Sequence, residues 1–124
     1  MDRKILSLLA LLGTLSIAHA QSALKWDSKT LELYPAASQK TVRAEFGFTN
    51  TSPQPVVIGA VKSSCGCTTV SLDKKVYLPG EKGHITGTFT TGRNKGVVTK
   101  AISVSVKGEA KPTVLVMVTH LGER

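Results

Sequence analysis

The chain is poor in aromatic residues, cysteine and acidic residues, and each shortage narrows what it can do. Of its 124 residues, 5% are aromatic, 2 are cysteine and 8 are acidic, against 16 lysines and arginines. Because few aromatic side chains are available to stack on nucleic-acid bases, no nucleic-acid partner is expected. Two cysteines exclude a disulfide-rich scaffold. The length and the 41% hydrophobic content exclude a multidomain enzyme, a disordered tail and a polytopic membrane protein.

One apolar run stands out, and it has the organisation of a cleavable secretory signal. Two basic residues precede the apolar segment 5–17, and residues 18–20 have the A-x-A form of a cleavage site. The run is shorter than the ~20 residues that span a bilayer. We therefore predict a signal peptide over residues 1–20, one domain over 21–124, no transmembrane segment after cleavage, and a periplasmic or secreted protein. Cleavage leaves 14 basic and 7 acidic residues, so the charge falls only from +8 to about +7.

The remaining sequence consists of short apolar alternations separated by turn residues. Residues 42–48 alternate apolar and polar side chains, as in a half-buried antiparallel strand. Residues 56–61 form a near-continuous apolar run, which is typical of a strand covered on both faces. Pro79-Gly80 is typical of a tight turn. The pattern predicts an all-β fold, an immunoglobulin-like antiparallel β-sandwich of about seven strands, with a small closed barrel as the alternative.

Four short motifs follow one another between residues 46 and 104. They are Phe46-x-Phe48-x-Asn50-Thr51, Ser64-Cys65-Gly66-Cys67-Thr68, Leu78-Pro79-Gly80-Glu81 and Ile85-x-x-x-Phe89. In this order they resemble the DUF1573 family of small exported bacterial domains, related in fold to the immunoglobulin-like modules of the major-sperm-protein and Hydin type. The resemblance covers a core of about 42–104. It implies an immunoglobulin-like fold and an exported location, and it implies no settled activity.

Cys65-Gly66-Cys67 is the most distinctive chemical feature. In an extended strand the two sulfurs face the same way with Cα atoms roughly 6.5 Å apart, and Gly66 lets the chain pucker and bring them closer. Four interpretations are open: a local disulfide or buried thiol pair, a Cu(I) site with two thiolate ligands, a labile bond for thiol-disulfide exchange, and chance occurrence or pairing with a cysteine of another molecule. A third copper ligand would come from His84, Met117 or His120.

No arrangement of residues predicts catalysis. The sequence contains no Ser-His-Asp or Cys-His-Asn arrangement and no phosphate-binding glycine motif, so we predict a non-enzymatic protein without catalytic residues. Basic residues concentrate near the C-terminal third: Arg93, Lys95, Lys100, Lys107 and Lys111. They predict a basic surface for an anionic polymer, a lipid headgroup surface or an acidic protein, unless they serve only to solvate the domain and protect its edge strands.

The sequence thus predicts an exported, non-enzymatic binding or assembly module of the cell envelope, with an envelope or exported protein as its partner. The first alternative is an extracytoplasmic copper-binding protein or chaperone that holds Cu(I) with Cys65 and Cys67. The second is a thiol-disulfide redox protein. Cu(I) is the one cofactor that the residues suggest.

Overall fold

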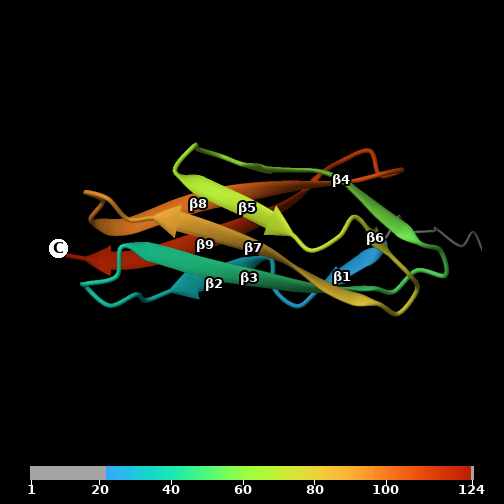
Figure 1. The fold of residues 1–124 in the computed structure, drawn as a ribbon, viewed down its shortest axis with the longest axis horizontal. Helices are drawn as coiled ribbons and strands as arrows, with labels where there is room; N and C mark the ends of the chain where they lie inside the picture. The colour runs from blue at the N-terminus through green and yellow to red at the C-terminus, as the bar shows by residue number, and fades with distance from the viewer. Residues whose placement is uncertain (1–21, 124) are drawn as a thin grey trace, which may run out of the picture.

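The computed structural model describes residues 22–123, which form nine strands and no helix. The strands are β1 (Leu24–Trp26), β2 (Thr30–Leu33), β3 (Thr41–Asn50), β4 (Val56–Ser63), β5 (Thr68–Leu72), β6 (Val76–Tyr77), β7 (Lys82–Thr90), β8 (Gly96–Val106) and β9 (Thr113–Gly122). They build a four-stranded sheet, β1-β3-β7-β5, and a five-stranded sheet, β2-β9-β8-β4-β6, packed face to face (Figure 1). The all-β sandwich is confirmed. The predicted signal peptide lies outside the described residues, and within them no helix is long and apolar enough to cross a membrane.

The core lies between the sheets and follows the predicted alternation. In β3 the apolar residues of the 42–48 pattern are all at most 3% exposed, and Phe46 and Phe48 are the largest of them. They face Ile102 of β8 and Leu115 and Met117 of β9, which are fully buried. Each sheet therefore turns one row of apolar side chains inward, as the period of two requires.

The first strand segment crosses from one sheet to the other. β1 pairs antiparallel with β3, whereas β2 pairs parallel with β9, from Thr30 opposite Val116 to Leu33 opposite Thr119. The bend between them is held by a hydrogen bond from Asp27 N to Gly47 O (3.0 Å) in the first sheet. The apolar residues of the sequence at positions 24, 26, 31 and 33 predict one edge segment that stops at Tyr34-Pro35, whereas the structure divides it into two strands. The pair of β2 with β9 is the parallel exception in an otherwise antiparallel sandwich.

The burial of the central strand β4 differs from the prediction. Its pairing with β8 shifts register between Ile58 and Val61, which marks a β-bulge. Gly59 and Ala60 lie in this bulge and are exposed, although Ile58 is fully buried. The prediction that residues 56–61 are covered on both faces is wrong, because the bulge turns the small residues of the run toward solvent.

Candidate functional site

Cys65 and Cys67 are joined by a disulfide within a tight turn. Their Cα atoms are 5.4 Å apart, closer than in an extended strand, and Gly66 between them has open space around it. The turn is closed by its own backbone, because Thr68 N donates to Cys65 O at 3.3 Å and Ser63 Oγ donates to the same oxygen at 2.8 Å. Cys65 is half-buried and Cys67 exposed, so the bond is accessible from solvent.

This turn carries the chain from the five-stranded sheet to the four-stranded sheet. On the side of β4, Ser64 N donates to Ala101 O (2.8 Å) and Ala101 N donates to Ser64 Oγ (3.1 Å), which ties the turn to β8. On the side of β5, Thr90 N donates to Cys67 O (3.2 Å), which ties it to β7. The disulfide therefore lies at a point where both sheets are fastened to one short turn.

Directly after the turn, β5 forms an open edge of the four-stranded sheet. The bond between Cys67 and Thr90 fixes which residues of the ladder exchange hydrogen bonds, since hydrogen-bonded and non-hydrogen-bonded pairs alternate. By this alternation Val70 and Leu72 direct their backbone N–H and C=O groups away from β7. An extended peptide lying beside β5 would meet these groups.

The four sheet edges are not equally protected. β6 has only two residues, β1 contains Lys25 and β2 contains Glu32, and shortness and charge both discourage pairing with another strand. β5 has five residues, Thr-Thr-Val-Ser-Leu, and none is charged. It is therefore the edge best suited to accept a strand from another molecule.

The three predicted accessory ligands lie in other contacts. Met117 is fully buried in the core, with its sulfur near Gly87. His84 lies on β7 with Nε2 3.6 Å from the carboxylate of Asp73. His120 lies on β9, where its ring stacks on Tyr34 at 4.4 Å and its Nε2 is 3.3 Å from Glu32. Within residues 22–123, no three His, Cys, Asp or Glu side chains are grouped so as to hold a metal ion.

The predicted basic residues are not gathered on one face. Arg93 and Lys95 lie in the connection before β8, and Lys107 and Lys111 lie in the turn after it. β8 has 11 residues, so these two pairs are separated by roughly 35 Å along the strand. Lys100 belongs to the inward row of β8, with Nζ 5.5 Å from the centre of the buried Phe89 ring.

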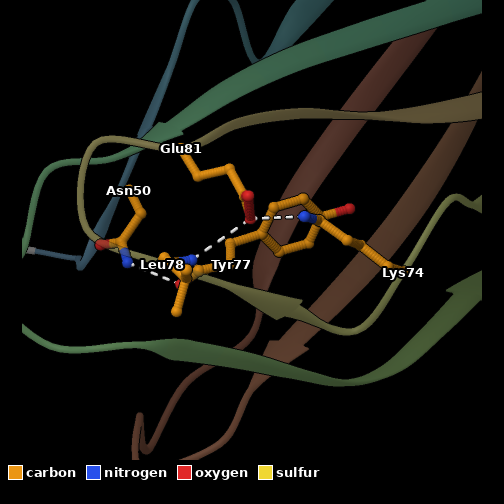
Figure 2. A network of polar contacts seen from close by, with 5 residues as sticks. All are labelled: Asn50, Lys74, Tyr77, Leu78 and Glu81. Atoms are coloured by element: carbon orange, nitrogen blue, oxygen red, sulfur yellow. Dashed lines mark hydrogen bonds and ion pairs between the residues drawn. The ribbon is translucent and has the colours of Figure 1, made fainter.

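A second group of motif residues is centred on the buried side chain of Asn50. Asn50 is 0% exposed, and its Nδ2 donates to Gln54 O at 2.8 Å. The same nitrogen donates to Tyr77 O at 2.9 Å (Figure 2). Its Oδ1 accepts from Ser52 N at 2.9 Å and from Ser52 Oγ at 2.7 Å. One amide thus satisfies backbone groups of strand β6 and of the connection between β3 and β4, which explains why an amide is needed at this position.

The Leu-Pro-Gly-Glu motif forms the turn that faces Asn50. Gly80 has a φ of 81°, which glycine adopts without strain, and its N–H donates to Asn50 O at 2.7 Å. In return Asn50 N donates to Glu81 O at 2.9 Å, and the Glu81 carboxylate accepts from Leu78 N (3.3 Å) and from Lys74 (2.6 Å; Figure 2). Two sequence motifs about thirty residues apart are therefore joined in one hydrogen-bonded network. We call it the Asn50–Glu81 network.

The family comparison matches the chain from strand β1 to strand β9. The model described as "Protein of unknown function (DUF1573)" matches residues 24–121, which includes the 42–104 core and the strands on either side of it. This chain belongs to the DUF1573 family. No curated protein has a significant sequence match to it.

This DUF1573 domain is similar in fold to several solved structures. A protein of unknown function from Porphyromonas gingivalis W83 has a TM-score of 0.68 and 15% identity over 82% of this chain and 50% of its own. The Pseudomonas aeruginosa CupB2 chaperone has a TM-score of 0.59 and 10% identity over 77% of this chain and 54% of its own. The ASH/PapD-like domain 7 of human CEP192 has a TM-score of 0.58 and 10% identity over 82% of this chain and 87% of its own. The chain thus spans half of the Porphyromonas protein, and similar sandwiches also lie within larger proteases and glycoside hydrolases.

In the Asn50–Glu81 network of this DUF1573 domain, protonation of the Glu81 carboxylate is coupled to folding. The hydrogen bond from Lys74 lowers the pKa of Glu81 below its ordinary value of 4.5; partial burial opposes this effect, and the N–H of Leu78 adds to it. A carboxyl whose pKa is lower in the folded state stabilises the fold above its unfolded-state pKa. That contribution is lost as the pH falls through the lower, folded-state pKa.

We expect Glu81→Gln to lower the free energy of unfolding at pH 7 and to lose this effect in acid. Urea unfolding of both proteins at pH 7, 5 and 3 should give a difference that is present at pH 7 and shrinks below about pH 4.5, where the unfolded carboxyl becomes protonated. Lys74→Gln should reproduce the pH-dependent part, because it removes the main partner. A difference that stays constant from pH 7 to pH 3 would contradict the coupling.

Proposed function

We propose that this chain is an exported, non-enzymatic binding module of the cell envelope that takes up an extended segment of a partner protein at the β5 edge. The observation that carries the proposal is β5 itself, the longest of the four edge strands, uncharged, with Val70 and Leu72 directing backbone groups outward. Addition of a strand to an open sheet edge gives affinity through main-chain hydrogen bonds. The likeness in fold to the CupB2 chaperone and to the ASH/PapD-like domain of CEP192 supports a role in binding proteins.

The Cys65–Cys67 turn has a supporting role in this proposal. It fixes the point at which the chain enters β5, because Cys67 O receives Thr90 N–H and Cys65 O receives Thr68 N–H. The disulfide restricts this turn in the unfolded chain as well, and a ring this small contributes only about 1.5 kcal/mol by the chain-entropy model. We therefore propose that the bond orders the start of the edge strand more than it stabilises the whole domain.

The Cu(I) and thiol-exchange functions stay predictions from the sequence. The Cu(I) function begins from free thiols, whereas the two sulfurs are bonded to each other in the structure. The thiol-exchange function begins from such a bond. Since His84, Met117 and His120 make their contacts elsewhere, no observation favours the copper function over the binding module.

The test compares partner capture by two double variants that add the same charge. Protein secreted by expressing bacteria is immobilised and exposed to envelope extract. Thr69→Lys with Ser71→Lys places two lysines on exposed positions of β5, whereas Thr30→Lys with Thr41→Lys places them at exposed positions elsewhere. We expect the β5 variant to reduce capture at least tenfold, about 1.4 kcal/mol, and the control to retain it.

Hydrogen exchange then locates the contact on the captured complex. The amides of Val70 and Leu72 should exchange more slowly when the partner is bound, because they become hydrogen-bonded to its strand. A Cys65→Ser, Cys67→Ser variant should bind more weakly, and its urea midpoint should fall by about 1 M, which corresponds to about 1.5 kcal/mol. Equal capture by the β5 variant and its control, or unchanged exchange at both amides, would overturn the proposal.

A further inference from the structure

The two sulfurs of the Cys65–Cys67 disulfide have different surroundings. Cys67 is exposed, and a Cβ added at the neighbouring Gly66 would meet no atom within 4 Å, so this end of the bond is open to a molecule from solvent. Cys65 is half-buried, and its Sγ accepts a hydrogen bond from the backbone N–H of Cys67 at 3.2 Å. One sulfur is therefore accessible, and the other already has a hydrogen-bond donor.

These surroundings match the two roles in thiol–disulfide exchange. A thiolate attacks one sulfur of a disulfide, and the other sulfur leaves as a thiolate. The attack needs access, which Cys67 Sγ has. The departure is easier where a donor already points at the leaving sulfur, because hydrogen bonds to a charged acceptor are stronger than those to a neutral one. Cys65 Sγ has this donor at 3.2 Å, whereas Cys67 Sγ lies 4.0 Å from Thr68 Oγ1.

A lysine adds positive charge at the end of the sandwich where the turn lies. The half-buried Lys100 belongs to the inward row of β8, with Nζ 5.5 Å from the centre of the Phe89 ring. Phe89 pairs with the residue after Cys67, and the residue after Lys100 exchanges two hydrogen bonds with the residue before Cys65. A cation near a cysteine favours its thiolate. Lys100 therefore also favours departure of a sulfur as thiolate.

The turn has contacts that do not depend on the disulfide. Ser63 Oγ donates to Cys65 O at 2.8 Å and to Thr68 O at 2.9 Å, and Thr68 N donates to Cys65 O at 3.3 Å. None of these bonds involves a sulfur atom. A disulfide that closes so short a loop also contributes little to the stability of a fold. Opening the bond should therefore leave the domain folded and the two thiols close together.

We propose that the Cys65–Cys67 disulfide oxidises external thiols by exchange. A thiolate attacks Cys67 Sγ and forms a mixed disulfide, while the bond between the two cysteines breaks and its electron pair passes to Cys65 Sγ. A second thiolate attacks the external sulfur of the mixed disulfide and releases Cys67 as a thiolate. Two external thiols thus lose two protons and two electrons and become a disulfide. This chain gains the electrons, takes two protons from water and becomes a dithiol, so one chain oxidises one pair of thiols.

Reduced glutathione is the probe that tests this exchange. With about 5 mM glutathione at about pH 7.5, more than half of the disulfide should open within about ten minutes, and the circular dichroism spectrum should stay that of the folded domain. A bond that stays intact for a day, or that opens only as the domain unfolds, would overturn the proposal.

The position of the first mixed disulfide tests which sulfur is attacked. Acid stops the reaction at early times, and N-ethylmaleimide then labels the free thiol. Mass spectrometry with fragmentation at Gly66 assigns each label to its cysteine. Glutathione should be found on Cys67 and maleimide on Cys65, with about a tenfold excess over the reverse arrangement. Equal amounts of the two arrangements, or an excess of glutathione on Cys65, would overturn the assignment of the two roles.

Two lysine substitutions test the contribution of charge. Lys100→Gln should slow the opening of the disulfide about threefold, because it removes the cation on the inward row beside the turn. Lys62→Gln removes a cation from an exposed position of β4 and should leave the rate unchanged. Equal rates for the two variants would overturn the role of Lys100.

A second thiol identifies the source of the substrate. Glutathione represents small thiols, and a reduced short peptide with one cysteine represents the cysteines of proteins. Reaction of both probes at Cys67 assigns the site to protein cysteines as well, whereas reaction of glutathione alone assigns it to small thiols. Glutathione is too small to add a strand to β5, so its reaction succeeds or fails independently of partner capture at that edge.

Discussion

Replacing Asn50 by alanine should lower the free energy of unfolding by about 4 kcal/mol, a large part of the 5–15 kcal/mol typical of a single domain. The substitution removes four hydrogen bonds at once. Two of the groups left behind are the backbone carbonyls of Gln54 and Tyr77, and the bond to Tyr77 is buried. An unsatisfied buried group costs about 1–3 kcal/mol, because it has lost water and gained no partner.

The same substitution at a less embedded asparagine is the control. Asn94 is exposed and its Nδ2 donates to one acceptor, Thr91 O, at 2.8 Å. Asn94→Ala should therefore cost about 1 kcal/mol or less. Urea unfolding followed by circular dichroism measures both variants. Similar decreases in the free energy of unfolding for Asn50→Ala and Asn94→Ala would mean that the Asn50–Glu81 network contributes little to stability.

Gly83→Ala should destabilise the domain by about 3 kcal/mol, which is the larger end of the cost of overpacking a core. Gly83 pairs with Phe48 on β3, and an added Cβ would lie 2.7 Å from Phe48 Cζ and closer still to the ring of Tyr77. Both rings are 1% exposed and meet edge to face at 4.8 Å. Rigid rings in a packed core have no room to withdraw, so the backbone itself must move.

A second glycine in a strand gives the comparison for this prediction. A Cβ at Gly59 would meet its nearest neighbour, Ser105 O, at an ordinary 3.5 Å. Gly59→Ala should therefore change stability by about 0.5 kcal/mol or less. Thermal and urea unfolding of the two variants separates a specific clash from the general effect of removing a glycine. If Gly83→Ala unfolds at the wild-type urea concentration, the packing around Tyr77 is looser than described.

The sequence predicted the architecture because the core alternation is strict. Residues 42–48 alternate without interruption, and the structure places their apolar members inside. The path of the first segment was beyond prediction, since Asp27 bends the chain between sheets through a bond to Gly47, which lies twenty residues further on. Period-two patterns identify inward and outward residues of a strand but not its neighbour.

The motifs were visible in the sequence before their roles were. Asn50 and Glu81 stood out as parts of a resemblance, but the hydrogen bonds that join them cross between distant turns. The open β5 edge follows from the order of the strands in the sheet, which no spacing of residues in the sequence reveals.

The parallel pairing of β2 with β9 determines when this domain can fold. Thr30 pairs with Val116, so an early strand waits for the last one to be synthesised. A nascent chain that leaves the ribosome strand by strand therefore lacks β9, the strand between β2 and β8, until translation is nearly finished. Completion of the five-stranded sheet is thus postponed to the end of synthesis, and an exported chain of the kind we propose would be threaded across a membrane before that sheet is complete.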